Sequence, residues 1–459
     1  MRLEKYCQMR VGNTLFFVKI SLVLLILGIP QVFADSESTP LLVDSELIDI
    51  SESQSKLNSA SISANPTAVD IITGTGVLGR TLGINPDTGI YLGGAWIGNT
   101  DYLFNGGIND DQRWTNNSFA ILNFTIDAQK LMGWKGATWS TEFLQFNGQN
   151  TNGLAGSVQG YNSLPGPMPL DRSELYQLWY RQALFNDKFI FRIGKSLPSL
   201  DFDNVVKPVA LDNSQLFIPA VSGLLYTPIF VNPSSLGIMP GYYNSAYGIT
   251  TSYAPIKEWY VSVGAYDGSL ATGTQTGMNV WPGFTGSYLY LGETGLNWLL
   301  GEDNKPGNIG VGVWSQTGPI SGPPNITQEV GADGTYIFGS QRLWYKNPNI
   351  DSSGISMYFQ YGINNSDALP MPQYGGAGLT FFGLIPHRPY DSFGAGFALS
   401  QLNPNSFTNY SEMMYQGYYQ LQVIRGVYLE PALSYIPDPG ASSDYPPAFA
   451  GTLQLIVLF

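Results

Sequence analysis

Cysteine and histidine are nearly absent from this chain of 459 residues, which contains one of each. Cys7 precedes the first apolar run, whereas a lipid-modified cysteine would follow it, and a single cysteine builds no disulfide framework. His387 stands between two residues typical of a surface turn, and one histidine cannot form a multi-histidine metal site. No serine lies in a G-x-S-x-G nucleophile motif. These absences predict a protein that is not an enzyme and that has no cofactor and no metal.

Charge is scarce as well. Only 12% of the residues are charged, against 14% aromatic residues and 53 glycines. Acidic residues outnumber basic ones by 34 to 21, which gives a net charge of −13. This acidity disfavours nucleic-acid binding and a pore that collects anions, because both need a basic surface. A phosphate-binding P-loop is also absent.

Long apolar runs are missing beyond the first residues. The run Ile20–Ile29 is too short to cross the roughly 30 Å of a bilayer core. Basic residues precede it and the small-residue site Val32–Ala34 follows it, as in a cleaved export signal, which we predict at 1–34. Without spanning helices, residence in a membrane requires a closed β-barrel.

What the chain does contain is short segments of alternating apolar and polar residues. In the last segment, apolar side chains occupy every second position from Leu453 to Phe459, which is the period of a strand that buries one face. Sixteen such segments can be marked, and the gaps between them alternate long and short. The segments are 89–97, 119–129, 137–147, 174–183, 189–194, 245–253, 258–266, 286–298, 308–316, 335–345, 354–363, 376–384, 391–400, 411–422, 426–435 and 451–459.

This rhythm predicts an all-β fold, namely a sixteen-stranded antiparallel transmembrane β-barrel with short periplasmic turns and long extracellular loops. We place the barrel at 75–459, and we interpret 35–74, which is rich in Ser and Asn, as a flexible periplasmic leader. Pro431 conflicts with a barrel strand, because proline removes a hydrogen-bond donor from the ladder.

Charged side chains inside such strands are expected to face the lumen, since lipid-facing positions should be apolar. For example, period 2 turns Trp179 inward if Tyr176, Leu178 and Tyr180 face lipid. An aromatic face and hydrogen-bonding groups of both kinds suit a sugar ring. The alternative is that these residues only solvate a water-filled wall. The lumen candidates are Asp127, Glu142, Trp179, Arg181, Arg192 and Arg342.

Five stretches resemble the carbohydrate-selective porin family, OprB type. They are Gly83–Gly98, Leu131–Trp134, Leu175–Tyr180, Phe191–Lys195 and Val427–Tyr435. The last one resembles a family strand that also carries a proline, which weakens the objection from Pro431. The resemblance covers roughly residues 75–459, and its motifs are structural, so they are specific for the family and uninformative about the preferred sugar.

The resemblance implies passive diffusion of mono- or oligosaccharides across a Gram-negative-type outer membrane. It also implies outer-membrane lipid as surroundings and a homotrimer as an assembly that such porins often form. Phe459 resembles the C-terminal signal that the barrel-assembly machinery reads. The longest gap, 195–244, resembles the loop that folds into sixteen-stranded porins and narrows them, although an external loop that caps the mouth is the alternative. Its constriction candidates are Lys195, Asp201, Asp203 and Lys207.

Three alternatives stay open. A general, non-selective porin would share the whole pattern. A non-conducting barrel could act as a surface adhesin through its long loops. An outer-membrane hydrolase would have to use His387, the one histidine of the chain.

Overall fold

The computed structural model describes residues 76–108, 112–166, 168–205, 223–241, 243–256, 258–321, 329–348 and 353–459. The predicted export signal, 1–34, and the predicted leader, 35–74, lie outside these residues. Among the described residues, the helices are all too short or too polar to cross a membrane.

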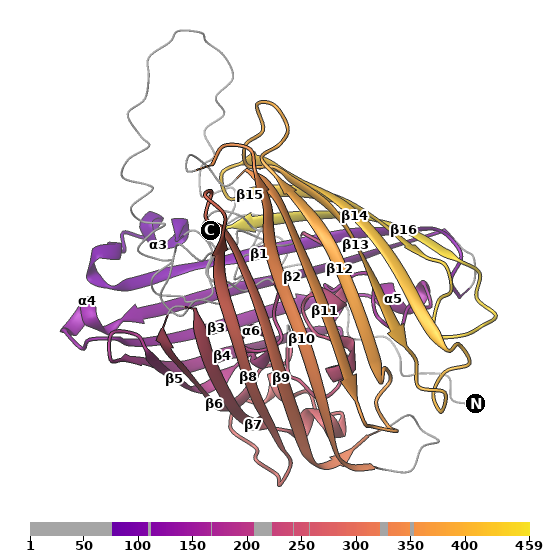
Figure 1. Ribbon diagram of the computed structural model, residues 1–459, viewed down its shortest axis with the longest axis horizontal. Coiled ribbons are helices and arrows are strands. Elements are labelled where there is room, and N and C mark those ends of the chain that lie inside the picture. The colour runs from indigo at the N-terminus through magenta and orange to yellow at the C-terminus, as the bar shows by residue number, and fades with distance from the viewer. Residues whose placement is uncertain are drawn as a thin grey trace, which may run out of the picture. The chain divides into compact units, whose positions relative to one another are not determined.

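Sixteen antiparallel strands form one closed barrel in which each strand pairs with its neighbours in sequence. The ring closes where β1 pairs with β16, and Figure 1 shows the indigo first strand beside the yellow last one. This confirms the predicted fold class and the number of strands. The strands are β1 Ile90–Asn105, β2 Arg113–Asp127, β3 Ala137–Asn147, β4 Asp171–Leu184, β5 Phe189–Ser196, β6 Ala246–Ile256, β7 Trp259–Asp267, β8 Tyr288–Leu300, β9 Lys305–Ile320, β10 Glu329–Tyr345, β11 Gly354–Asn364, β12 Gln373–Phe382, β13 Ser392–Gln401, β14 Ser411–Ile424, β15 Val427–Ile436 and β16 Ala448–Leu458.

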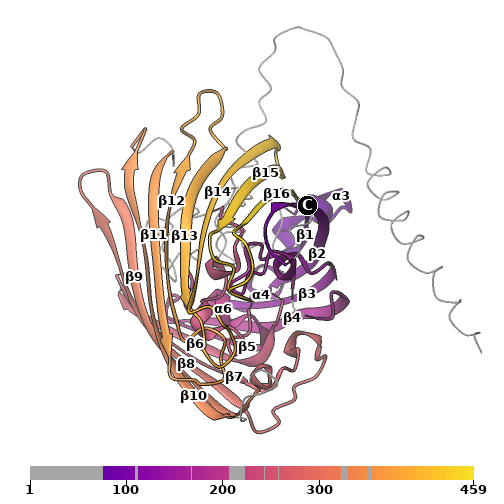
Figure 2. The same cartoon turned by 90° about the vertical axis from the view of Figure 1, so that its right-hand side faces the viewer.

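The described helices are short and lie outside the strands. The α-helices are α3 Val77–Thr81, α4 Ala128–Met132, α5 Thr151–Leu154 and α6 Pro198–Asp201. The 3-10 helices are η2 Pro86–Thr88, η3 Thr227–Ile229, η4 Pro233–Ser235, η5 Ser269–Thr272 and η6 Thr276–Met278. Both views place α6, which belongs to the connection between β5 and β6, within the ring of strands (Figures 1 and 2).

The wall buries polar residues and exposes apolar ones. In β16, Leu453 is 47% exposed, whereas its neighbour Thr452 is 4% exposed. Apolar side chains therefore face outward and polar ones face inward, which is the inverse of a soluble sandwich and the arrangement that lipid requires.

Strand β1 is longer than predicted. The sequence favoured an end at residue 97, but the strand continues to Asn105. Its last part includes the inward polar residues Asn99 and Asp101, whose polarity is typical of a loop in the sequence. Both are buried because Asn162, from the connection between β3 and β4, hydrogen bonds to them at 3.0 and 2.6 Å.

The predicted alternation of long and short gaps is therefore too strict. The connection from β1 to β2 shrinks to 106–112, and the one from β9 to β10 shrinks to 321–328 because both of those strands extend. The three long connections 148–170, 197–245 and 268–287 still follow odd-numbered strands. They lie at the same end of the barrel, which is the end predicted to be extracellular.

One predicted side-chain direction is wrong. Tyr176 is 3% exposed and packs with the inward residues Leu144 and Phe146 instead of facing lipid. The register between β3 and β4 shifts at Glu142, so β4 has one extra residue there. Such a β-bulge reverses the face of every residue beyond it.

Pro431 fits its strand because the ladder is interrupted beside it. It pairs with Leu453 of β16 on one side. On the other side, the pairing of β14 with β15 passes from Tyr418 directly to Leu421. The missing N–H of the proline therefore breaks no regular hydrogen bond, as expected for proline in a sheet.

Glycines on the inner face make room for aromatic rings on the next strand. A Cβ added to Gly312 would lie 2.1 Å from the ring of Tyr336, and one added to Gly310 would lie 2.4 Å from Phe338. The rings lie flat on these glycines, and the Tyr336 hydroxyl donates to Glu293 Oε2 at 2.9 Å. Close approach of ring to backbone thus explains the glycine content of this part of the wall.

We expect Gly312→Ala to lower the free energy of unfolding by about 1–3 kcal/mol, because the methyl group forces the Tyr336 ring off the wall. Gly292→Ala is the matched control on the adjacent strand. Its added Cβ would lie 3.7 Å from Val313, an ordinary contact. Urea titration of both variants in lipid vesicles tests this, and equal stability of the two would contradict the ring-on-glycine packing.

Candidate functional site

Two long connections reach from one side of the barrel to inward residues of the opposite wall. Gln416 of β14 holds both of them. Its amide nitrogen donates to the Tyr161 carbonyl at 2.9 Å, and its amide oxygen accepts from the Leu225 N–H at 2.5 Å. Tyr161 belongs to 148–170 and Leu225 to 197–245, so one side chain joins two segments that are distant in sequence.

Glu412, four residues earlier on β14, holds the connection 148–170 by its charge. Its carboxylate accepts from the Ser157 hydroxyl and the Val158 N–H at 2.8 Å, and from the Gln159 N–H at 3.0 Å. A fourth donor, the Gly440 N–H at 2.7 Å, comes from the connection between β15 and β16. Hydrogen bonds to a carboxylate are about twice as strong as neutral ones.

The two connections also bond directly to each other through their backbones. The Ser163 N–H donates to the Leu225 carbonyl at 2.7 Å, and the Thr227 N–H donates to the Gly160 carbonyl at 2.9 Å. Further along, Tyr226 hydrogen bonds to Tyr358 of β11 through their hydroxyls. The inner faces of β11, β13 and β14 are therefore covered by loop residues and form a hydrophobic core inside the barrel with them.

Four predicted residues meet at the opposite side, on β4, β5 and α6. Arg181 and Arg192 are directly paired across the two strands. The Arg192 guanidinium lies 5.5 Å from the centre of the Trp179 ring and forms an ion pair with Asp201. The Asp201 carboxylate also accepts from Thr250 at 3.0 Å and lies 3.4 Å from the Tyr266 hydroxyl.

This arrangement combines charge of both signs with an aromatic face. Two arginines side by side repel each other, and the Asp201 carboxylate offsets that repulsion. The Arg192 and Asp201 side chains are 18% and 16% exposed, so solvent reaches both. An inward-facing cluster with this chemistry can donate to and accept from hydroxyl groups of a solute.

The other lumen candidates are bound to the wall itself. Glu142 is buried and accepts from Asn123 at 2.8 Å and Gln177 at 2.6 Å, one on each neighbouring strand. Asp127 lies at the end of β2, where its carboxylate caps α4 through the N–H groups of Gln129 and Lys130. Its role there is to start a helix, which the sequence prediction did not foresee.

Arg342 is fully buried on β10. Its guanidinium lies over the rings of Tyr345 and Phe382, at 4.9 and 5.4 Å from their centres. The prediction that it faces inward agrees with its burial. Aromatic rings cover it, however, so it is far less accessible than Arg192.

Lys195, one of the constriction candidates, is fully buried. Its ammonium donates to the carbonyls of Leu175 at 2.5 Å, Gly277 at 2.6 Å and Asn279 at 2.7 Å. Lysine has three donors, so none remains for a solute. The side chain instead fixes the connection 268–287 to β4.

Asp203 is buried behind α6, and its N–H donates to Glu293 Oε2 at 2.7 Å. Burial, and then the charge of Glu293, raise the pKa of the Asp203 carboxyl well above its usual value. Ionisation of this carboxyl therefore costs more than that of an exposed one, which suits an anchor better than a charged pore residue. Lys207 lies outside the described residues.

Phe459 closes the barrel, since its N–H donates to Gly94 of β1 at 3.0 Å and its carbonyl accepts from Gly94 at 2.8 Å. His387 is exposed in the connection between β12 and β13. No group of three or more metal-ligating side chains occurs among the described residues.

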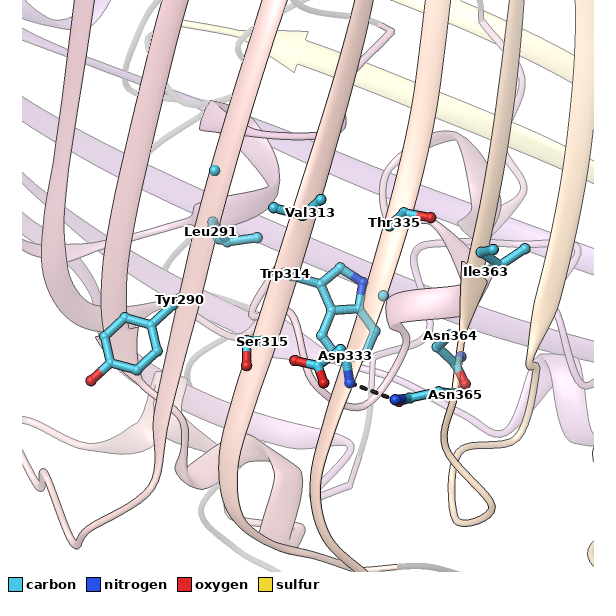
Figure 3. A pocket seen from close by; sticks show the side chains of 12 residues that line it. Tyr290, Leu291, Val313, Trp314, Ser315, Asp333, Thr335, Ile363, Asn364 and Asn365 are labelled. Atoms are coloured by element: carbon cyan, nitrogen blue, oxygen red, sulfur yellow. Dashed lines mark hydrogen bonds between the residues drawn. The ribbon is translucent and has the colours of Figure 1, made fainter.

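A hollow of about 610 Å³ lies on the other face of the wall, across β8 to β11 (Figure 3). Val313, which lines it, is 55% exposed, whereas the next residue, Trp314, is 2% exposed and points to the opposite face. The hollow therefore faces outward toward lipid and is no part of the lumen.

The sequence prediction missed the residues that hold the loops, chiefly Gln416, Glu412, Glu293 and Asp101. Each lies at an inward position of a strand by the same period-2 rule. A polar residue at an inward position, flanked by aromatic or small residues, was the signal that could have identified them. The loop residue that each of them binds could not be read from the sequence.

Three comparisons place the chain among known proteins. The family described as "Carbohydrate-selective porin, OprB family" matches residues 115–459. Porin B of Pseudomonas aeruginosa is 22% identical over 410 residues, which cover 79% of this chain and 86% of that protein. OprB of Pseudomonas putida at high pH has a TM-score of 0.70 at 18% identity, covering 84% of this chain and 99% of that one. The low-pH structure of the same protein has a TM-score of 0.54 at 15% identity, covering 87% and 100%.

We expect Glu412→Gln to speed hydrogen exchange at the amides of residues 157–159 and 440. The amide that replaces the carboxylate has one acceptor oxygen for four donors, and lost hydrogen bonds to a charged group cost about 1.5–3 kcal/mol each. Exchange mass spectrometry of peptides from these segments measures the effect. Glu258→Gln, in the turn between β6 and β7, is the control. Unchanged protection of 157–159 would contradict the anchoring role of Glu412.

Proposed function

The chain belongs to the OprB family of carbohydrate-selective porins and forms an outer-membrane channel for sugars, and we propose that the sugar is selected beside Trp179, Arg192 and Asp201. The single observation that carries this proposal is the contact of the Arg192 guanidinium with both the Trp179 ring and the Asp201 carboxylate. Passage is passive diffusion and uses no cofactor.

The chemistry of this cluster matches a sugar ring. Hydroxyl groups both donate and accept hydrogen bonds, and Arg192 and Asp201 supply the complementary groups. The C–H face of the ring is apolar and packs on an aromatic surface such as Trp179. A pore that selects by such contacts binds weakly enough for the solute to leave.

The two connections 148–170 and 197–245 decide how much of the lumen stays open. Gln416 holds both of them on β14, and Glu412 holds the first. Asp201 lies near the start of the longer one and contacts Arg192. We infer that they narrow the lumen and leave the passage along the β4–β5 side, where Arg192 and Asp201 remain partly exposed. Constriction of this kind favours a selective channel over a general one.

Biogenesis is part of the same proposal. Export through the signal at 1–34 precedes assembly, and Phe459 is the residue offered to the barrel-assembly machinery. The proposal includes outer-membrane lipid around the wall and a homotrimer, which native mass spectrometry of the detergent-extracted protein tests.

We expect Trp179→Ala and Arg192→Gln each to weaken sugar binding in the pore by about 5- to 100-fold. Loss of one such contact costs roughly 1–3 kcal/mol, and each 1.4 kcal/mol is tenfold in affinity. Sugar-dependent block of single-channel conductance in a planar bilayer measures the affinity, with glucose and maltooligosaccharides as solutes. Arg425→Gln, an exposed residue of the turn between β14 and β15, is the control.

The outcomes separate the hypotheses. Block by sugar that both variants weaken supports the proposed site. Block that neither variant changes would place the site elsewhere in the lumen. Conductance without any block would indicate a general pore, and a folded barrel without conductance would indicate an adhesin.

A further inference from the structure

At the end of the barrel where the long loops lie, the four strands between β4 and β9 stop short of those two strands. Strand β5 pairs with β4 only from Leu178 onward, so β4 extends beyond β5 at this end of the barrel. On the far side, β9 continues to Ile320, past the last residue that pairs with β8, which is Gln316. The edges of β4 and β9 thus project above the four strands between them.

The connection 268–287 bridges this gap and bonds to both edges. At its start, the Gly268 carbonyl accepts from the Gln316 amide at 2.9 Å, and the Ala271 carbonyl accepts from the Ser321 N–H at 2.7 Å. In its middle, the carbonyls of Gly277 and Asn279 accept from Lys195. The same ammonium donates to the Leu175 carbonyl, on the part of β4 that extends beyond β5.

Lys195 is therefore the anchor of the bridge. It is 0% exposed although it lies one residue before the end of the short strand β5, because the connection covers it. Asp267 fixes both ends of the same connection, since one carboxylate oxygen accepts from the Ser269 N–H at 3.0 Å and the other accepts from the Phe284 N–H at 3.3 Å. These contacts hold the connection against the wall from Gly268 to Phe284.

The outer side of this connection is apolar and aromatic. Residues 268–287 include no charged residue. Trp281 is 79% exposed, Val280 is 51% exposed and Phe284 is 44% exposed. The Phe284 ring stacks on Tyr288, and Tyr288 stacks on Tyr290, which lie on the outward face of β8. An aromatic ladder thus runs without interruption from the connection onto the lipid-facing wall.

We propose that residues 268–287 form a lipid-contacting extension of the barrel wall, which inserts Trp281 and Val280 into the interface of the outer leaflet. Continuity with the lipid-facing wall is the reason to choose lipid over a protein partner. Tryptophan and tyrosine concentrate at membrane interfaces, because their rings are apolar and their N–H or O–H groups reach water. The extension also packs against β4, where Lys195 joins it to Leu175.

Spin labelling tests the proposal, since Cys7→Ser gives a cysteine-free background. In phosphatidylcholine vesicles, a nitroxide at Trp281→Cys is compared with one at Leu453→Cys on the lipid-facing wall. A second reference is Thr274→Cys, an exposed polar position of the same connection. We expect the ratio of oxygen to nickel-chelate accessibility at 281 to lie near that at 453 and several-fold above that at 274.

Two results would overturn the proposal. A ratio at 281 equal to that at 274 would place the connection in water. Low accessibility to both reagents at 281 would mean that another protein surface, such as a second copy, covers it. Lys195→Met tests the anchor separately, with folding verified by heat-modifiable migration on a gel. It should make the 281 label more mobile and more accessible to nickel, and an unchanged label would remove Lys195 from the account.

Discussion

The amide side chain of Gln416 is the contact on which the inside of the barrel depends. A ring of sixteen strands encloses more space than inward side chains fill, so the loops that fold into it decide how much of the interior stays open. Gln416 uses both of its N–H donors and its carbonyl to hold two loops and Ser434 of the next strand at once. The Glu412 carboxylate on the same strand accepts three hydrogen bonds from the loop 148–170 and a fourth from the Gly440 N–H.

Several acidic residues of the wall are engaged in hydrogen bonds within the protein. Asp101, Glu293 and Glu412 each accept hydrogen bonds from loop residues or from tyrosines that line the wall. The net negative charge of the chain therefore says little about the ions that the channel admits. Arg192 with Asp201 is different, because both side chains stay partly exposed. That difference is why we place solute selection there.

The strand pattern was readable from sequence because each strand has one face toward lipid, which forces the period of two. All sixteen predicted segments correspond to observed strands. The failures have local causes. Residues 98–105 carry inward polar groups that a loop satisfies, and the β-bulge at Tyr176 reverses a face. The inward direction of Arg192 and Trp179 followed from the alternation of inward and outward residues along their strands. The burial of Lys195 depends on a loop whose position no local sequence pattern predicts.

The most direct test of this account is the size cut-off of the pore, measured by exclusion of polyethylene glycols from single channels of the wild type and of Gln416→Leu. Leucine has a similar size and none of the three hydrogen bonds. The account predicts that the variant admits polymers that the wild type excludes, with a matching rise in conductance. The same cut-off in both, from a variant verified as folded, would contradict the claim that Gln416 holds the loops that set the width of the passage.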